Sequence, residues 1–509
     1  MNKLVIVGGG SAGWLTALYA KKLNPEAEVL LIESDEIGIL GAGEGATPHL
    51  VAMLNYLEIP ITDFIKNCQA TIKTSVKFTN WTKDRNSYHH PFWSQSPASN
   101  DFMFKRNDPY QEAELSWAHY CAAFENQNPV DYVMLAKSGD NYQVPYILNK
   151  TDKVIENHSL VSLHFDARLA ASFLKSKGLA RGIQVKEGIV TKINLDENKY
   201  ITSLLMKDDK IECDFVFDCT GFKRLIIGNF YKSTWRSHAD YLPAKKAIPF
   251  FLEMGEKIPP FTEAIAMKYG WMWKIPLQHR YGCGYVFDSD YITDEEAVEE
   301  IETFLGFVPT YPRQDKGAFK FSAGCYEQIW VKNCLAIGLS SGFIEPLEAT
   351  SLMQAVVVLR RFMISKSNLS TKNEKVKDRF NALFLKETQE VVNFLHLHYL
   401  TDRQDTNFWK EFRIKNKTPE KVAYILSALA DRAITWEFDF RDHTFFESEP
   451  YNYILTGIGI LDKSTLCKTG APYITADRLK EYENLLIKQK EIIPQFIDHR
   501  NFIESVKAK

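Results

Sequence analysis

The sequence has few cysteines, little net charge and no long apolar run, and each absence excludes a class of protein. Its eight cysteines include no pair with the C-x-x-C spacing of a zinc or redox site. A formal net charge of −3 gives no electrostatic basis for binding nucleic acid or a membrane surface. No stretch reaches the roughly 18–20 apolar residues of a membrane span.

The first residues are expected to form a strand and not the core of a secretion signal. The apolar run at residues 4–7 passes directly into glycines, whereas a signal-peptide core needs roughly 7–15 apolar residues. Most cysteines lie in apolar runs, as buried thiols do. We therefore expect a cytoplasmic protein.

The length and the hydrophobic content of the chain are enough for a large globular fold. The 509 residues are 45% hydrophobic, which is enough for a large core and two closely joined domains. Aromatic residues make up 13% of the chain. They belong either to this core or to an aromatic-lined pocket for a flat ligand, and composition leaves both open.

Apolar patterning predicts an α/β fold that begins with a βαβ unit. Residues 4–7 have the continuous apolar run of a parallel strand, residues 28–32 are expected to form a second strand, and residues 14–22 form the helix between them. Further strands are expected at 183–190, 203–207, 214–217 and 334–337, and helices at 164–177 (ended by Gly178), 378–399 and 478–489. Segment 92–128 is expected to form surface excursions, and the polar segment 366–377 a linker or a solvated loop.

The first turn has the spacing of a dinucleotide site. Gly8 permits a sharp exit from the strand, Gly10 leaves room for a pyrophosphate, and Gly13 allows the helix to pack closely on the sheet. Ser11 and Ala12 lie between them, where free amides and the helix dipole face the phosphates. Glu33 ends the second strand, in position to accept hydrogen bonds from a ribose diol.

Two later segments favour FAD over NAD. Residues 214–221 form an apolar strand ending in D-x-T-G, which includes Asp218, and residues 336–341 form a small-residue turn that includes Gly338 and Leu339. Both resemble additional FAD contacts of the flavoprotein monooxygenase superfamily. There is no second G-x-G-x-x-G for a nicotinamide cofactor. A separate flavin reductase is therefore expected to supply FADH2.

Several further motifs resemble flavin-dependent halogenases, above all the tryptophan halogenases. They are W-M-W-K-I-P at 271–276, G-A-G-E-G-A-T-P at 41–48, the strand at 70–81 that carries Lys73, H-F-D-A-R at 164–168, and E-P-L-E-A-T at 345–350. They occur in order as far as about Trp409. The resemblance implies a Rossmann-like FAD-binding domain of the monooxygenase type, with a mainly helical substrate-binding part. We place the first at 1–370, with substrate-side insertions near 80–160, and the second at 371–509.

The resemblance implies that FADH2, O2 and a halide ion give hypohalous acid, which halogenates a small aromatic substrate held in a separate compartment. Lys73 captures or hydrogen-bonds this acid, and Glu348 deprotonates the ring or orients the halogen donor. From the residues alone, a surface lysine like Lys77 is the more usual interpretation of Lys73, and Glu348 is also consistent with an acid at a helix N-terminus.

The remaining site residues are also carried over from the family. The resemblance assigns FAD contacts to Gly43, Glu44, Gly45, Arg168 and Leu352, and the halide to backbone amides of Thr350 and Ser351. Trp271 and Trp273 form a wall that separates flavin from substrate. His90, Phe92 and His398 line the substrate pocket, although a lone histidine is more often a hydrogen-bonded core or surface residue. No metal site is expected.

Three positions depart from the family pattern. Ser351 replaces a glycine and lacks its freedom at positive φ, so we expect a reshaped halide loop that prefers bromide or iodide. Residues 444–450 pass almost directly to 451–457 without the expected aromatic stretch. We therefore expect a more open site for indoles, phenols or anilines rather than strictly free tryptophan. Gly45 replaces alanine, with slight effect.

Two other functions compete with halogenation. The runner-up is an aromatic hydroxylase on the same scaffold, which the tryptophan wall and Lys73 argue against. A flavin-binding protein without turnover is the third, and it would be expected to have lost Lys73 or Glu348. A homo-oligomer is compatible with the sequence, which sets no number of subunits.

Overall fold

The computed structural model describes residues 3–34, 43–84, 86–92, 122–124, 133–148, 154–157, 161–207, 209–432, 434, 445–446 and 448–508. Its contacts group the chain into two compact units, each assembled from three segments. Unit one comprises residues 1–70, 165–238 and 322–388; unit two comprises 71–164, 239–321 and 389–509. The division expected near residue 370 stays a prediction.

Unit one is built on a six-stranded sheet in the order β11-β2-β1-β15-β24-β23. Strands β1, β2, β11, β15 and β24 are mutually parallel, and β23 pairs antiparallel with β24. The strands are β1 (Lys3–Val7), β2 (Glu28–Glu33), β11 (Gln184–Glu187), β15 (Phe215–Asp218), β23 (Trp330–Val331) and β24 (Cys334–Ala336). Their side chains are buried through most of β1, β2 and β15, as continuous apolar runs predict.

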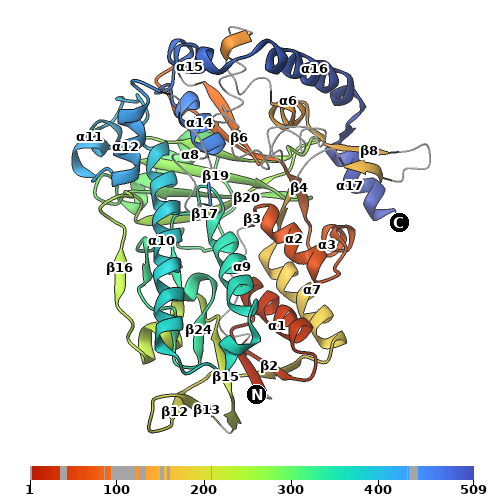
Figure 1. Ribbon diagram of the computed structural model, residues 1–509, viewed down its shortest axis with the longest axis vertical. Coiled ribbons are helices and arrows are strands. Elements are labelled where there is room, and N and C mark those ends of the chain that lie inside the picture. Colours follow the sequence, from red (N-terminus) through yellow and green to blue (C-terminus); the bar gives the residue numbers. More distant parts are fainter. Residues whose placement is uncertain are drawn as a thin grey trace. The chain divides into compact units, whose positions relative to one another are not determined.

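Two helices of unit one lie side by side, as Figure 1 shows: α1 (Ser11–Leu23) and α7 (Ala167–Ala180). The prediction that Gly178 ends a helix is wrong, because α7 continues through it. A Cβ at Gly178 would lie 2.7 Å from the Trp14 ring, so this glycine allows the two helices to approach. The predicted start at 164 is also wrong, because β10 (Ser162–Phe165) precedes the helix, which Asp166 caps.

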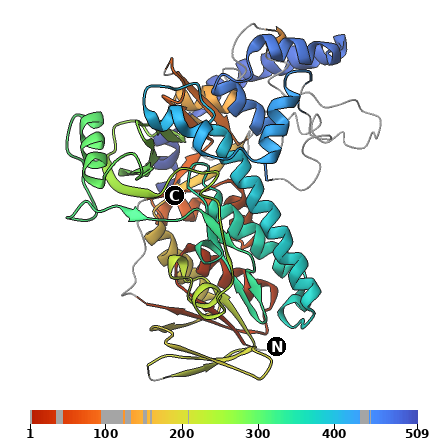
Figure 2. The ribbon, with the colours of Figure 1, turned by 90° about the vertical axis from the view of Figure 1, so that its left-hand side faces the viewer.

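The other elements of unit one surround this sheet and helix pair. Strands β12, β13 and β14 form an antiparallel meander that can be followed in yellow-green in Figure 2. The elements are β3 (Glu44–Gly45), α2 (Pro48–Tyr56), α3 (Ile61–Asn67), β12 (Lys192–Leu195), β13 (Ile201–Leu205), β14 (Lys210–Glu212), η4 (Gly221–Lys223), η5 (Leu225–Phe230), β16 (Trp235–Ser237), β22 (Gly324–Tyr326), η6 (Gly338–Ser340), β25 (Gly342–Phe343), α9 (Thr350–Met363) and η7 (Lys366–Leu369).

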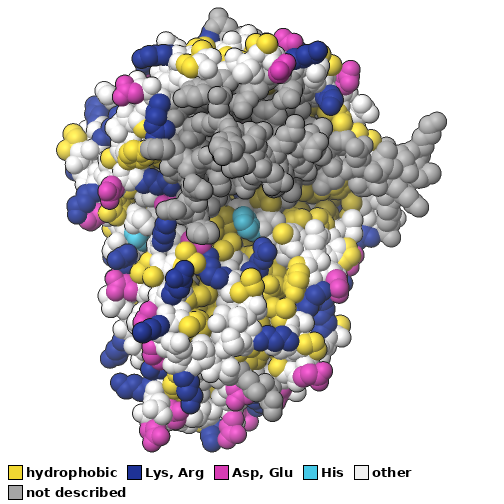
Figure 3. Space-filling model, viewed as in Figure 1, with side chains coloured by type: hydrophobic (Ala, Val, Ile, Leu, Met, Phe, Trp, Pro, Cys, Tyr) yellow, Lys and Arg dark blue, Asp and Glu magenta, His cyan; other side chains and the backbone are white. Residues whose placement is uncertain are grey.

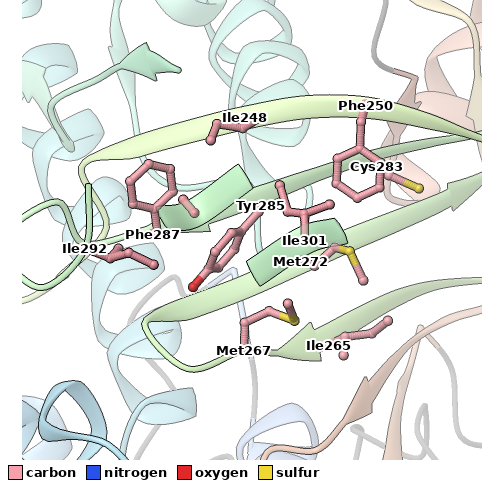
Figure 4. Close-up of a cluster of buried hydrophobic side chains, with 11 residues drawn as sticks. Ile248, Phe250, Ile265, Met267, Met272, Cys283, Tyr285, Phe287, Ile292 and Ile301 are labelled. Atoms are coloured by element: carbon pink, nitrogen blue, oxygen red, sulfur yellow. The ribbon is translucent and has the colours of Figure 1, made fainter. Parts of the chain in front are cut away.

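Unit two is built on a seven-stranded sheet in the order β21-β17-β20-β19-β18-β5-β6. Only the β18·β5 pair is parallel. The strands are β5 (Ser75–Thr79), β6 (Ser87–Pro91), β17 (Lys246–Glu253), β18 (Phe261–Ala266), β19 (Gly270–Pro276), β20 (Arg280–Phe287) and β21 (Phe319–Lys320). One face packs on helix α8 (Asp294–Leu305) through a cluster that includes Met272, Tyr285 and Ile301, shown in Figure 4.

The described residues after 371 are mainly helical. The predicted helices at 378–399 and 478–489 are confirmed as α10 (Glu374–His398) and α16 (Ala476–Ile492), whereas segment 366–377 contains η7 and the first turn of α10. The remaining elements are β4 (Thr71–Lys73), α6 (Met134–Asp140), β7 (Gln143–Val144), β8 (Tyr146–Leu148), β9 (Val154–Asn157), α11 (Asn407–Lys415), α12 (Glu420–Ala428), α14 (Ser448–Gly457), α15 (Lys463–Gly470), η8 (Ala471–Tyr473), η9 (Ile493–Gln495), β26 (Ile497–Asp498) and α17 (His499–Lys507).

The surface drawn in Figure 3 carries basic and acidic side chains interspersed over its described part. Such mixing is ordinary for a globular protein and gives no single-sign patch on this face. Within the described ranges, no helix combines the length and apolar character needed to cross a membrane. Most of the predicted excursion at 92–128 lies outside the described residues.

Candidate functional site

Four of the predicted cofactor segments meet at one edge of the six-stranded sheet. Gly8 follows β1, Glu33 ends β2, Asp218 ends β15, and Gly338 follows β24. These strands are adjacent and parallel, so their carboxyl ends lie at the same edge. This edge is where ligands bind in open α/β sheets.

The three glycines of the first turn have different steric surroundings. Gly8 has φ +118°, and a Cβ there would lie 2.1 Å from the Cys219 carbonyl oxygen. A Cβ at Gly13 would lie 1.9 Å from the Gly8 carbonyl oxygen. By contrast, a Cβ at Gly10 would meet nothing within 4 Å. Gly8 and Gly13 thus shape the turn, and Gly10 leaves open space beside it.

Buried hydroxyls at the same edge lack partners. In the described part of the chain, the side-chain oxygens of Ser11 and Ser340 are shielded from solvent and have no hydrogen-bond partner. Ser340 lies in η6 beside Leu339, and Gly338, with φ +69°, brings this turn close to Ala12. Unpaired buried hydroxyls are costly. Together with the space at Gly10, they fit a polar ligand such as the FAD pyrophosphate and ribityl chain.

The two acids of this edge already have protein partners. Glu33 accepts a hydrogen bond from Trp14 Nε1 at 3.3 Å and forms an ion pair with Lys175. A carboxylate has capacity for further donors such as a ribose diol. Asp218 is fully buried and accepts from the amides of Thr220, Ile226 and Ile227 at 2.8–3.1 Å. Its carboxylate therefore shapes the D-x-T-G turn.

Glu44, in the motif at 43–45, has a raised pKa. Burial, followed by the nearby Asp166 carboxylate, raises the pKa of Glu44 to about 7. Gly43 on one side has φ +83°. Asp166 also caps α7, accepting from the Arg168 amide at 3.0 Å. Residues 41 and 42 of this motif lie outside the described residues.

The loop predicted to bind halide ends at the N-terminus of α9. Ala349, the N-cap, adopts the left-handed conformation with φ 55° and ψ 34°, and α9 begins at Thr350. Ser351 is helical, so the premise that this position needs glycine's freedom at positive φ is wrong. Amides of Thr350 and Ser351 are among the free donors at the start of a 14-residue helix, where a halide is favoured.

Two further residues of this loop are buried. The Thr350 side-chain oxygen has no hydrogen-bond partner among the described residues. Glu348 is 2% exposed and precedes the N-cap, so it is not in the first helical turn. Leu352 follows in the first turn of α9 and is half-buried. The loop thus combines a buried acid, a buried hydroxyl and free amides.

Lys73 is the last residue of β4, and its side chain is fully buried. The surface-lysine interpretation is therefore wrong for this residue. Its Nζ lies 4.9 Å from the centroid of the Phe92 ring, which brings these two predicted site residues together. Lys77, four residues later on β5, is instead partly exposed and forms a 2.6 Å ion pair with Asp140.

Both predicted pocket histidines contact the ring of Phe394. The His90 ring lies 5.4 Å from it and that of His398 5.0 Å, centroid to centroid. His398 Nδ1 lies 2.9 Å from the Phe394 carbonyl oxygen one helical turn earlier. That geometry is typical of a core histidine, whereas His90 also contacts Phe446, at 6.4 Å. Residues 444 and 447 of the same segment lie outside the described residues.

Trp271 and Trp273 lie on one face of β19. They alternate with Met272, which packs into the cluster of Figure 4, so their rings point to the opposite face of the sheet. The two ring centroids are 6.3 Å apart. Gly284 leaves room for the Trp273 ring, because a Cβ there would lie 2.1 Å from it. The pair forms a wall of two adjoining indoles.

A buried histidine network around β4 was not predicted. His164 Nδ1 lies 3.0 Å from Thr71 Oγ1, and His164 Nε2 lies 3.0 Å from Thr262 Oγ1. His499 Nε2 accepts from the amide of Ile72 at 2.9 Å. His164 belongs to the H-F-D-A-R motif and could have been singled out there. His499 has no local sequence signal.

Comparisons with known proteins agree with these features. A family model described as tryptophan halogenase matches residues 3–470. Tryptophan 6-halogenase SttH of Streptomyces toxytricini is 30% identical over 481 residues, which cover 90% of each chain. Tryptophan 7-halogenase RebH of Lentzea aerocolonigenes is 29% identical over 489 residues, covering 91% of this chain and 90% of RebH.

Solved structures of similar proteins span nearly the whole fold. Xcc4156, a flavin-dependent halogenase from Xanthomonas campestris, has a TM-score of 0.83 at 26% identity and covers 99% of this chain and 98% of its own. The SttH structure has a TM-score of 0.85 at 26% identity, with 99% of each chain covered.

Proposed function

Because this chain belongs to the tryptophan halogenase family, we propose that it halogenates an electron-rich aromatic small molecule of the indole or phenol type, using Lys73 and Glu348. The chain is a flavin-dependent halogenase that uses FADH2, O2 and halide. Family membership also implies a separate flavin reductase. We place its activity in the cytoplasm.

Unit one would bind the cofactor and the halide. FADH2, when bound, would give two electrons to O2, and the halide would give two more as it becomes hypohalous acid, with the second oxygen atom leaving as water. The open space at Gly10 admits the pyrophosphate, and the unpaired hydroxyls of Ser11 and Ser340 donate to its oxygens or to the ribityl chain. Amides at the start of α9 hold the halide, with the Thr350 hydroxyl as an additional donor.

Burial of Lys73 is the observation that supports its role best. A lysine removed from water can donate a hydrogen bond to hypohalous acid, or accept the halogen on its amine, without competition from solvent. The Phe92 ring lies beside Lys73 and offers an apolar face for a flat substrate. Attack by an aromatic carbon forms the carbon–halogen bond and releases the oxygen as water.

The ring then has to lose a proton. Glu348 is buried and acidic, and we assign it the role of accepting this proton. The Trp271–Trp273 wall would keep substrate from the flavin, so that halogenation replaces hydroxylation. The missing aromatic stretch near residues 444–457 favours indoles, phenols or anilines over strictly free tryptophan. Because Ser351 is helical, its lack of glycine's freedom does not favour bromide or iodide, and relative rates with the three halides decide the preference.

Turnover of a small panel tests the proposal. Indoles, phenols and tryptophan are supplied with a generic flavin reductase, NADH, FAD and chloride, bromide or iodide in turn. We expect halogenated product that requires halide, with Lys73→Ala lowering the rate by at least about 100-fold. Lys77→Ala is the matched control, because it removes an ion-paired lysine of the next strand in the sequence, and it should keep near-normal turnover.

Three results would contradict parts of this proposal. Hydroxylated product without halide would indicate a monooxygenase. Full activity of Lys73→Ala would remove that residue from the chemistry. Efficient turnover of tryptophan alone would disprove the proposed substrate class.

A further inference from the structure

At the edge of strand β4 that faces away from β10, a histidine side chain accepts a backbone hydrogen bond. One edge of β4 pairs with β10, with Leu163 opposite Ile72 and Ser162 opposite Lys73. The amide of Ile72 makes a different bond, donating to Nε2 of His499 at 2.9 Å. His499 is fully buried and lies 427 positions away in the sequence. The residue next to Lys73 is thus held by an imidazole.

The two bonds of His499 fix its protonation state. Nδ1 lies 3.1 Å from the Ile258 carbonyl oxygen and must donate to it, so Nε2 is free to accept from Ile72. Burial lowers the pKa of His499 to about 3, which keeps the ring neutral. Protonation would put a donor opposite the Ile72 amide and break this bond.

His499 is itself anchored on both sides. Its amide donates to the Tyr142 carbonyl oxygen at 2.8 Å, and Asp498 caps α17 by accepting from the amides of Arg500 and Asn501 at 3.0 and 3.1 Å. The Arg500 guanidinium donates to the Gly255 carbonyl oxygen at 2.7 Å. An imidazole held this way is a fixed acceptor.

A second neutral imidazole braces β4 through a side chain. Thr71 Oγ1 donates its one proton to the Pro276 carbonyl oxygen at 2.7 Å, so it accepts from His164 Nδ1–H. Thr262 can then donate to His164 Nε2. Burial, then Lys73 and His499, hold the pKa of His164 well below its ordinary value.

We infer that His499 is a positioning residue for Lys73, with His164 as a second brace, and that α17 is therefore part of the halogenating machinery. This inference rests on the proposed role of Lys73. His499 lies beyond the family match, which ends at residue 470, whereas His164 lies within it. The brace holds the end of β4, and with it the Lys73 amine over Phe92, without adding a charge beside the amine.

The test separates the use of hypohalous acid from its formation. His499→Leu removes both hydrogen bonds, and His499→Gln keeps a donor and an acceptor. Halogenated product, FADH2 oxidation and halide oxidant captured by a thioether scavenger are measured in one reaction. In His499→Leu we expect product to fall roughly 10- to 100-fold, FADH2 oxidation to persist and captured oxidant to rise. His499→Gln should lie within a few-fold of wild type.

His396→Leu is the matched control. This histidine is also buried in unit two, where its Nδ1 contacts the Tyr241 carbonyl oxygen at 2.8 Å, and its pKa is lowered by burial to about 4. No described contact links it to β4, so it should keep the wild-type ratio of product to captured oxidant. Should His499→Leu yield no folded protein, His499→Asn, whose shorter amide cannot span both groups, is judged by the same ratio.

Each outcome decides the inference. An unchanged ratio in His499→Leu, or a parallel fall of product and captured oxidant, would overturn it. The Lys73→Ala reaction is run alongside: if it keeps full activity, the proposed function fails first. If Lys73→Ala is inactive while His499→Leu keeps the wild-type ratio of halogenated product to captured oxidant, only the positioning role fails.

Discussion

The glycine turns of unit one and strand β4 of unit two are both built with backbone groups in close contact, but different parts of the chain supply those contacts. At the turn after β1, a Cβ on Gly13 would strike the carbonyl of Gly8, five residues away. At β4, the amide of Ile72 donates to His499, 427 positions away, and Thr71 Oγ1 donates to the Pro276 carbonyl oxygen, 205 positions away. A cofactor turn can therefore be encoded locally, whereas the position of a buried side chain such as Lys73 depends on distant residues.

The sharpest way to test this contrast is Gly13→Ala. Alanine in a helix is ordinarily favoured over glycine by about 1 kcal/mol. Here the added Cβ would lie 1.9 Å from the Gly8 carbonyl oxygen, and both groups belong to rigid backbone. We expect the free energy of unfolding to fall by on the order of 3 kcal/mol or more, measured by urea denaturation.

Gly10→Ala is the control for that substitution. Its Cβ meets nothing within 4 Å, so the FAD-free protein should unfold at the wild-type urea concentration. The methyl group would occupy the space left for the pyrophosphate, and FAD affinity should fall about tenfold or more. Equal stability of the Gly13 and Gly10 variants would contradict the steric account of this turn.

The second prediction concerns the pH dependence of stability in unit two. His499 has a folded-state pKa of about 3, below its ordinary value near 6.5, so the unfolded chain binds more protons between these values. Stability is full above pH 6.5 and is lost as pH falls toward 3. His499→Gln removes this group and should flatten the slope by up to about 1.4 kcal/mol per pH unit.

Urea unfolding at pH 7.5, 5.5 and 4.5 measures that slope. Gly10→Ala changes no titratable group and should keep the slope of wild type. Parallel curves for wild type and His499→Gln would show that His499 is not held neutral in the folded protein.

The smallest expected effect is a pH dependence of stability in unit one, where stability falls as pH rises. Because burial and Asp166 raise the pKa of Glu44 to about 7, the FAD-free protein should lose stability as pH rises from about 4.5 through 7. The side chain is half-buried, so solvent screening limits the change to about 1 kcal/mol. Glu44→Gln should remove this part of the pH dependence, and thermal unfolding between pH 5 and 8 would measure it.

The local parts of the fold were predictable for physical reasons. Continuous apolar runs identified β1, β2 and β15, and glycine spacing identified the turn that follows β1. The ordered motifs predicted the family, which the match over residues 3–470 confirms. Each of these signals lies within about ten residues of chain, the range over which strand periodicity and turn chemistry act.

Long-range packing could not be predicted from the same patterns. Gly178 suggested a helix end, but its role depends on Trp14 in a different helix. Lys73 and Lys77 have the same side chain in the same stretch, and only tertiary structure buries one and pairs the other with Asp140. No periodicity connects His499 to Ile72, since their bond depends on where α17 docks.

The 427-residue separation between Ile72 and His499 also sets an order of events during synthesis. At 5–20 residues per second, a ribosome needs roughly 20–90 s to reach the histidine after making the lysine strand. During that interval the Ile72 amide has no imidazole to bind, and closing so long a loop is among the slower steps of folding. Unit one, whose last segment ends at residue 388, is therefore complete in the nascent chain before the histidine that bonds to the lysine strand has been made.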